Sequence, residues 1–349
     1  MRHLLLLIAL TACKGTDTDT DPSDTDTDPV DSDTGEPLDA WPVTVRVTLD
    51  GAPVQATILQ PGTMVRGTTD AATGEGELVL DPGVEGGEVW VFASHPDART
   101  WGDELYSPPT EVVRIDLESF DPSDNPDYAF EDPGEPTNRA TTAQCAHCHV
   151  TINEAWFGSA HVTTASNPWV QDLYAGAASG FADQASCEAA GGSWWEGIGP
   201  GTAAPAERCY LGEGALPALN DCGETGPCDT VATDHGQCAD CHAPTIDGEL
   251  GGRDLLEATG LAYTYGVSCD ACHKVESVDI QADRRGVAGA LHIVRPSEPG
   301  TIAGPYAPLQ FGPYDDVAHP RMGSVPRDHY VDGTLCAGCH EQWQQTLHR

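Results

Sequence analysis

The chain has 349 residues, enough for two ordinary domains, and its 55 acidic against 16 basic side chains give a formal charge of -39. This acidic excess excludes a nucleic-acid binder, because neutralising phosphates requires a basic face. The 38 glycines and 27 prolines indicate many loops, which argues against an all-helical bundle or a doubly wound α/β enzyme.

The N-terminus predicts an export signal that ends in a lipid anchor. An apolar run over residues 4–10 follows a short basic start and is too short to span a bilayer. The run closes on Leu10-Thr11-Ala12-Cys13, which resembles a bacterial lipobox and implies cleavage before Cys13 and its lipidation. An ordinary secretory signal is the alternative. We therefore expect residues 1–13 to be a lipoprotein signal, with the protein lipid-anchored in a Gram-negative cell envelope, periplasmic or at the outer-membrane surface.

Residues 14–40 are a low-complexity tract of Thr, Asp and Pro with almost no apolar side chain to bury. Such a composition predicts an extended, disordered tether that lifts the rest of the chain off the membrane. A calcium-binding repeat is the alternative, but no glycine-containing ligand loop accompanies these acidic residues.

Residues 41–120 have the alternating pattern of β-strands. Apolar and polar residues alternate over 43–49, and Asp50-Gly51 is a hairpin-turn signal. Further short strands are expected at 54–59, 77–80, 88–93 and 111–117, which together predict a small antiparallel β-sandwich. The pattern resembles the carboxypeptidase regulatory-like or transthyretin-like sandwich, which implies a spacer or docking module. An acidic, Pro-rich linker is expected at 121–139.

The remaining segment, residues 140–349, contains four copies of Cys-x-x-Cys-His. The copies comprise Cys145, Cys148 and His149; Cys238, Cys241 and His242; Cys269, Cys272 and His273; and Cys336, Cys339 and His340. This spacing suits four covalently attached haem c groups, since two thiols three positions apart can add to the vinyl groups of one haem while the adjacent His binds its iron. Zinc binding and a redox disulfide are the alternatives, but neither requires a His after every second Cys. We expect a mostly helical and irregular tetrahaem cytochrome c domain.

A sixth ligand would set the chemistry of each iron, because two His ligands favour electron transfer and an open position admits a small molecule. Met322 is the single methionine of this segment, so His is the expected donor. The first motif is followed by Trp156 and by Ser159-Ala160-His161. With the four motifs, this pattern resembles the cytochrome c-554 family of multihaem cytochromes. The resemblance implies that His161 is a distal ligand of a haem attached to another motif.

Other histidines supply further distal candidates. Similar multihaem proteins place a distal His just ahead of a motif, as His235 and His329 are placed here, and His292 is the fourth candidate. His319 and His348 are reserves, and His147 inside the first motif is expected to point away. Arg253, Arg284, Arg285 and Arg295 are the positive residues available to an anionic substrate.

These features predict an electron-transfer protein more strongly than a catalyst. The alternative is a multihaem oxidoreductase with one open-site haem, acting on a small nitrogen or sulfur compound; a haem-bearing adhesion lipoprotein is a third interpretation. The acidity of the chain favours redox protein partners with a basic docking face, although it also serves solubility. The membrane is the other expected partner, through the lipid anchor.

Four cysteines lie outside the motifs and the lipid anchor, in an insertion at about 182–232. They are Cys187, Cys209, Cys222 and Cys228. An even number in an exported protein predicts two disulfides, for which three pairings are possible. The most local pairing joins Cys187 to Cys209 and Cys222 to Cys228. A redox-active dithiol or a metal site is the alternative.

Overall fold

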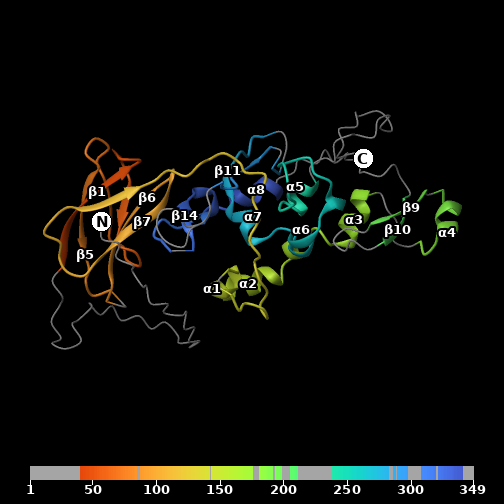
Figure 1. Ribbon diagram of the computed structural model, residues 1–349, viewed down its shortest axis with the longest axis horizontal. Coiled ribbons are helices and arrows are strands. Elements are labelled where there is room, and N and C mark those ends of the chain that lie inside the picture. Colours follow the sequence, from red (N-terminus) through yellow and green to blue (C-terminus); the bar gives the residue numbers. More distant parts are fainter. Residues whose placement is uncertain are drawn as a thin grey trace, which may run out of the picture.

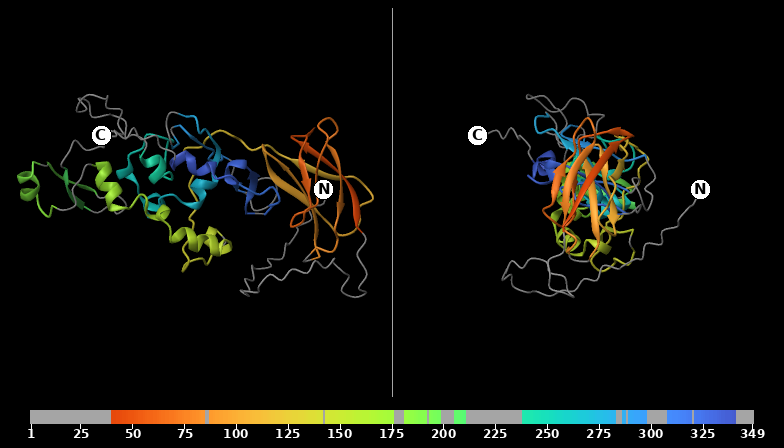
Figure 2. Two further views of the ribbon diagram at one scale, coloured as in Figure 1. Left: turned by 180° about the vertical axis from the view of Figure 1, so that it is seen from behind. Right: turned by 90° about the vertical axis from the view of Figure 1, so that its left-hand side faces the viewer.

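The computed structural model describes residues 40–84, 87–141, 143–175, 181–191, 193–198, 205–210, 238–282, 286–287, 289–297, 308–319 and 321–340. The expected signal, Cys13, the tether up to residue 39, His235, His348, Cys222 and Cys228 lie outside these residues. The described chain is elongated, with a two-sheet β-sandwich at one end and short helices in the middle (Figure 1). A helix and a hairpin form the opposite end, as the reverse view also shows (Figure 2).

The sandwich consists of two four-stranded sheets. One contains β2 (Ala52–Pro53), β1 (Trp41–Leu49), β5 (Glu75–Leu80) and β8 (Val113–Leu117), and the other runs β4 (Arg66–Thr68), β3 (Thr57–Leu59), β6 (Val89–His95) and β7 (Ala98–Leu105). The strand pairs are antiparallel except for β1 and β8, which run parallel. The expectation of a purely antiparallel sandwich therefore needs this one correction.

The core of the sandwich follows the alternation seen in the sequence. Val43, Val45 and Val47 on β1 are buried, and β8 buries every second residue in the same way. The expected strands at 54–59, 77–80, 88–93 and 111–117 correspond to β3, β5, β6 and β8. Strands β4 and β7 were not expected, because their sequences, RGT and ARTWGDEL, are polar and lack clean alternation.

The middle of the molecule is built from short helices and two-stranded sheets. Its helices are α1 (Cys145–Cys148), α2 (Val150–Phe157), η1 (Ala160–Thr163), α3 (Pro168–Ala175), α5 (Cys238–His242), η3 (Leu255–Glu257), α6 (Gly260–Tyr265), α7 (Cys269–His273), η4 (Asp328–Tyr330) and α8 (Thr334–His340). Its strands are β11 (Val275–Val278), which pairs antiparallel with β12 (Leu291–Ile293), and β13 (Leu309–Gly312), which pairs parallel with β14 (Gly323–Pro326).

The end opposite the sandwich is fastened by a disulfide. Cys187 in α4 (Gln184–Ala189) bonds to Cys209 in β10 (Pro205–Tyr210), with the two Cα atoms 5.6 Å apart. Strand β10 pairs with β9 (Ser193–Ile198), which places Trp194 opposite Cys209. This bond confirms the first half of the most local expected pairing; the second half lies outside the described residues.

Hydrophobic packing is unequal along the molecule. The sandwich has one large core, whereas the middle has three small apolar clusters, one of them mainly alanine. Across the described ranges, no helix has the length and apolar character needed to cross a membrane. The middle part therefore has little side-chain core of its own relative to its length.

Candidate functional site

Each Cys-x-x-Cys-His motif forms one turn of helix. Residues at i, i+3 and i+4 of a helix share one face, so both cysteines and the histidine of α5, α7 and α8 face the same side. In the first motif the helix ends at Cys148, but the His149 amide still donates to the Cys145 carbonyl at 2.9 Å, which completes the turn. Four helical turns thus present the same three side chains in the same order.

The eight motif cysteines form no disulfide bond within the described chain. Burial raises the pKa of the Cys272 thiol to about 12 and the pKa of the Cys238 thiol to about 11. Because the thiolate is the nucleophile in disulfide exchange, these raised pKa values count against a redox-active dithiol at either position. Among the described residues, no three His, Cys, Asp or Glu side chains gather closely enough to hold a metal ion by themselves. A haem iron, with four porphyrin nitrogens, needs no such cluster.

Contacts between motif side chains give the order of the four motifs in space. The side chains of Cys145 and Cys269 interact, which joins the first motif to the third. Cys272 interacts electrostatically with Cys336, which joins the third motif to the fourth. The side chains of Cys241 and Cys339 interact, which joins the second motif to the fourth. The motifs therefore follow one another in the spatial order first, third, fourth, second.

His161 lies beside the histidine of the fourth motif. The ring centroids of His161 and His340 are 6.0 Å apart and the rings are inclined at 73°. A metal–nitrogen bond is about 2.0 Å, so two imidazoles on opposite sides of one iron have ring centres roughly 6 Å apart. The separation of the two rings matches that spacing. The η1 turn that carries His161 is held by Thr164, whose hydroxyl donates to the His242 carbonyl at 2.7 Å.

His273 has the hydrogen bond that an axial histidine needs. Its Nδ1–H donates to the Phe311 carbonyl oxygen at 2.6 Å, which leaves the Nε2 lone pair for a metal. The Tyr330 ring lies nearly parallel to the imidazole, with centroids 5.8 Å apart, and its hydroxyl donates to the Cys272 carbonyl at 2.5 Å. In the second motif, the Nδ1 atom of His242 is buried without a hydrogen-bond partner.

The other histidines considered as distal ligands contact backbone or carboxylate oxygens or lie near the first motif. His292 is exposed, with Nδ1 3.3 Å from a Glu276 carboxylate oxygen, and the Nε2 atom of His329 lies 3.2 Å from the Val275 carbonyl. Burial, then Arg321, then the proximity of His149 lower the pKa of His319, so this reserve candidate lies near the first motif. The Nδ1 atom of His147 bonds to the Arg139 carbonyl at 2.9 Å.

The sequence did not indicate a buried polar cluster around the third motif. The side chains of Asp270 and Lys274 are buried and their charged atoms are 2.5 Å apart. Asp270 also accepts hydrogen bonds from the Tyr128 hydroxyl at 2.9 Å and from the Gln310 amide at 3.1 Å. The i,i+4 spacing of Asp270 and Lys274 could have predicted their ion pair from the sequence. The contact with Tyr128 could not have been predicted in this way, because Tyr128 lies far away in the chain, in the segment expected to be a linker.

The expected linker at 121–139 is packed against this middle part. Asp124 receives two hydrogen bonds from the buried guanidinium of Arg295, at 2.7 and 2.6 Å. The Arg253 guanidinium is likewise occupied, since it donates to the carbonyls of Pro244 and Ile246. Of the four arginines considered for an anionic substrate, these two therefore have structural partners; the other two lie outside the described residues.

Apolar side chains remain exposed beside the first motif. Ile152 on α2 is 68% exposed, and Val150 and Phe157 on the same helix are also exposed. The repeated Cys, Cys and His donor set, the small apolar clusters of the middle part and the His161–His340 spacing fit a covalently bound porphyrin.

Comparisons with protein-family models, curated proteins and solved structures find no match to the chain. The interpretation of the site therefore depends on the spacing of the motifs and on the geometry described above.

Proposed function

We propose that this protein is a lipid-anchored tetrahaem c-type cytochrome that transfers electrons between redox partners in the cell envelope. The observation that carries the proposal is the repetition of one helical turn, with two thiols and an imidazole on one side, at four neighbouring places in the described chain. A single Cys-x-x-Cys turn would be compatible with zinc or disulfide chemistry, but the histidine that completes each turn is explained by haem.

The chain's own residues have defined tasks under this proposal. Each cysteine pair would hold one haem covalently, and His149, His242, His273 and His340 would bind the irons. His161 would be the second ligand of the iron bound by His340, because their rings are spaced for it. Bound haem would supply one-electron chemistry, tuned by axial ligands, hydrogen bonding and burial.

The spatial order of the motifs indicates which haems would exchange electrons with partners. Because the third and fourth motifs lie between the other two, they form the interior of the series, and the first and second motifs are its ends. Electrons would therefore enter at one of these end motifs and leave at the other. The negative charge of -39 would favour a partner with a basic docking face.

Carbon monoxide binding separates this function from the open-site oxidoreductase. An electron carrier whose irons all have two tightly held ligands should show no spectral change when the fully reduced protein is exposed to carbon monoxide. The change is measured against total haem. A shift in one haem of the four would contradict the carrier and favour the oxidoreductase.

A further inference from the structure

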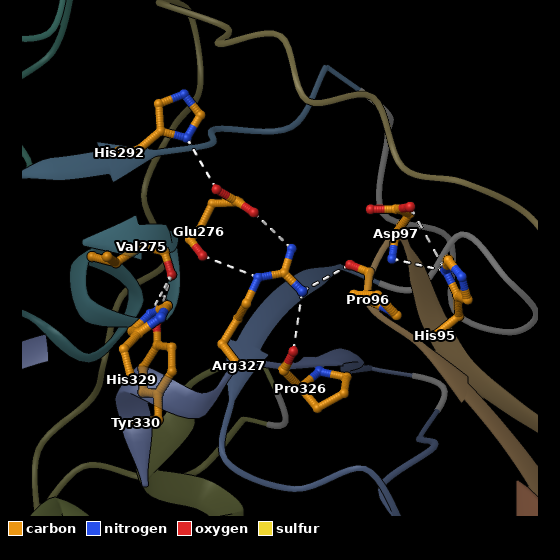
Figure 3. A network of polar contacts seen from close by, with 10 residues as sticks. All are labelled: His95, Pro96, Asp97, Val275, Glu276, His292, Pro326, Arg327, His329 and Tyr330. Atoms are coloured by element: carbon orange, nitrogen blue, oxygen red, sulfur yellow. Dashed lines mark hydrogen bonds and ion pairs between the residues drawn. The ribbon is translucent and has the colours of Figure 1, made fainter. Parts of the chain in front are cut away.

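The β-sandwich and the middle part meet at Arg327, which follows β14. Its Nη1 atom donates to the Pro96 carbonyl, in the turn between β6 and β7, at 2.7 Å. On the other side, Nη2 donates to the Glu276 carboxylate at 2.8 Å and Nε to the Glu276 carbonyl at 3.0 Å. Figure 3 shows this guanidinium between Glu276 and Pro96. Arg327 therefore connects the sandwich to β11, which begins two residues after the third motif.

The same guanidinium lies over two aromatic rings. Its carbon atom is 4.9 Å from the centroid of the Phe311 ring and 6.0 Å from that of Phe120. The two phenylalanines pack edge to face at 5.5 Å. Phe120 belongs to the end of the sandwich, since its amide donates to the Asp97 carbonyl at 3.1 Å. Phe311 is thus clamped between a residue of the sandwich and Arg327.

Phe311 is also the residue whose carbonyl accepts the Nδ1–H of His273. Phe311 is fully buried, and the Arg327 amide donates to the next carbonyl, that of Gly312, at 2.8 Å. A displacement of Arg327 would consequently move the acceptor of the His273 hydrogen bond. The junction with the sandwich and the axial histidine of the third motif are two ends of one packed unit.

We propose that Arg327 is a positioning residue that lowers the reduction potential of the third haem by holding the Phe311 carbonyl against His273. The β-sandwich, for which the sequence suggested a role as a spacer or docking module, is then part of the structure that tunes this haem. The inference rests on the proposed function, since it requires a haem at the third motif. A hydrogen bond from Nδ1–H makes an imidazole ligand more basic, and a more basic ligand favours the ferric state.

Arg327→Gln in the full-length holoprotein removes the forked contact to Glu276 and the cation above Phe311. The potentials of the individual haems are measured by a redox titration followed through their separate haem-methyl NMR signals. We expect one potential of the four to rise and the other three to stay at their wild-type values. Arg66→Gln is the control, because it removes an arginine that forms an ion pair across the junction, with Asp315 at 3.2 Å, without touching Phe311.

No shift in Arg327→Gln, a similar shift of several haems, or an equal shift in Arg66→Gln would each overturn the inference. If Arg327→Gln does not yield holoprotein, the same potentials are measured in Phe120→Leu. This substitution loosens the packing of the sandwich on Phe311 and should raise the potential of the third haem by a smaller amount. A wild-type chain without covalent haem would refute the proposed function itself. Four haems with unshifted potentials would refute this inference alone.

Discussion

At the scale of single residues, the third motif is held by charge as well as by apolar packing. Lys274 directly follows His273, and its ammonium group is fully buried against Asp270 and the Leu309 carbonyl, 2.8 Å away. Burial alone would raise the pKa of Asp270, but the charge of Lys274 and the hydrogen bonds to the carboxylate bring that pKa below its usual value. The carboxylate thus stays ionised and fastens α7 to both Tyr128 and Gln310.

Lys274→Met should therefore destabilise the holoprotein strongly. The substitution leaves the Asp270 charge buried without its cation, which costs about 3–5 kcal/mol. We expect a lower midpoint in chemical denaturation, and a partial recovery in the double variant Asp270→Asn/Lys274→Met, which removes both charges. If Lys274→Met and the wild-type protein have the same denaturation midpoint, the Asp270–Lys274 ion pair does not stabilise the third motif.

The same scale explains why the distal histidines were hard to assign from sequence. The axial role that we propose for the motif histidines follows from local spacing, because each histidine is adjacent to its cysteine. A distal ligand would be a long-range contact, and the sequence offers many histidines to the four proposed haem sites. The structure brings His161 to His340 and leaves His292 exposed beside Glu276. The sequence around His292 contains no feature that separates an exposed histidine from a distal ligand.

At the scale of elements, local patterns predicted most strands of the sandwich. The alternation on β1 gave its buried face correctly, whereas the polar strand β7 was hidden by its Arg, Asp and Glu residues. The parallel pairing of β1 and β8 joins segments far apart in the chain, so no local signal specified it. The packing of one motif helix against another could not be predicted either, because these helices are also far apart in the chain.

Packing of the fourth motif can be tested without reference to haem. A Cβ atom at Gly338 of α8 would collide with the side chain of Leu291 on β12. Gly338→Ala should therefore destabilise the protein by about 1–3 kcal/mol, through overpacking. Gly312→Ala on β13 is the matched control, because an added Cβ meets no atom within 4 Å. The two denaturation midpoints are compared; equal midpoints would contradict the packing of α8 against β12.

At the scale of the whole molecule, the described chain is a series of parts along one axis. The sandwich lies at one end, the four motifs follow, and the disulfide-bonded hairpin lies at the other end (Figure 1, Figure 2). The small apolar clusters of the middle part indicate that its stability depends on more than side-chain burial. Covalently bound haem would supply the missing apolar interior, which is why the haem assignment is central to both fold and function.

The most direct test of that assignment is the intact mass of the purified chain, produced in a host that matures c-type cytochromes and analysed after denaturation. We expect four haems to remain attached to the wild-type chain, and the double variant Cys238→Ala/Cys241→Ala, which lacks both thiols of the second motif, to retain three. A matched variant, Cys187→Ser/Cys209→Ser, removes the disulfide and should keep all four haems. A wild-type mass without haem, or four haems retained by Cys238→Ala/Cys241→Ala, would contradict the haem assignment.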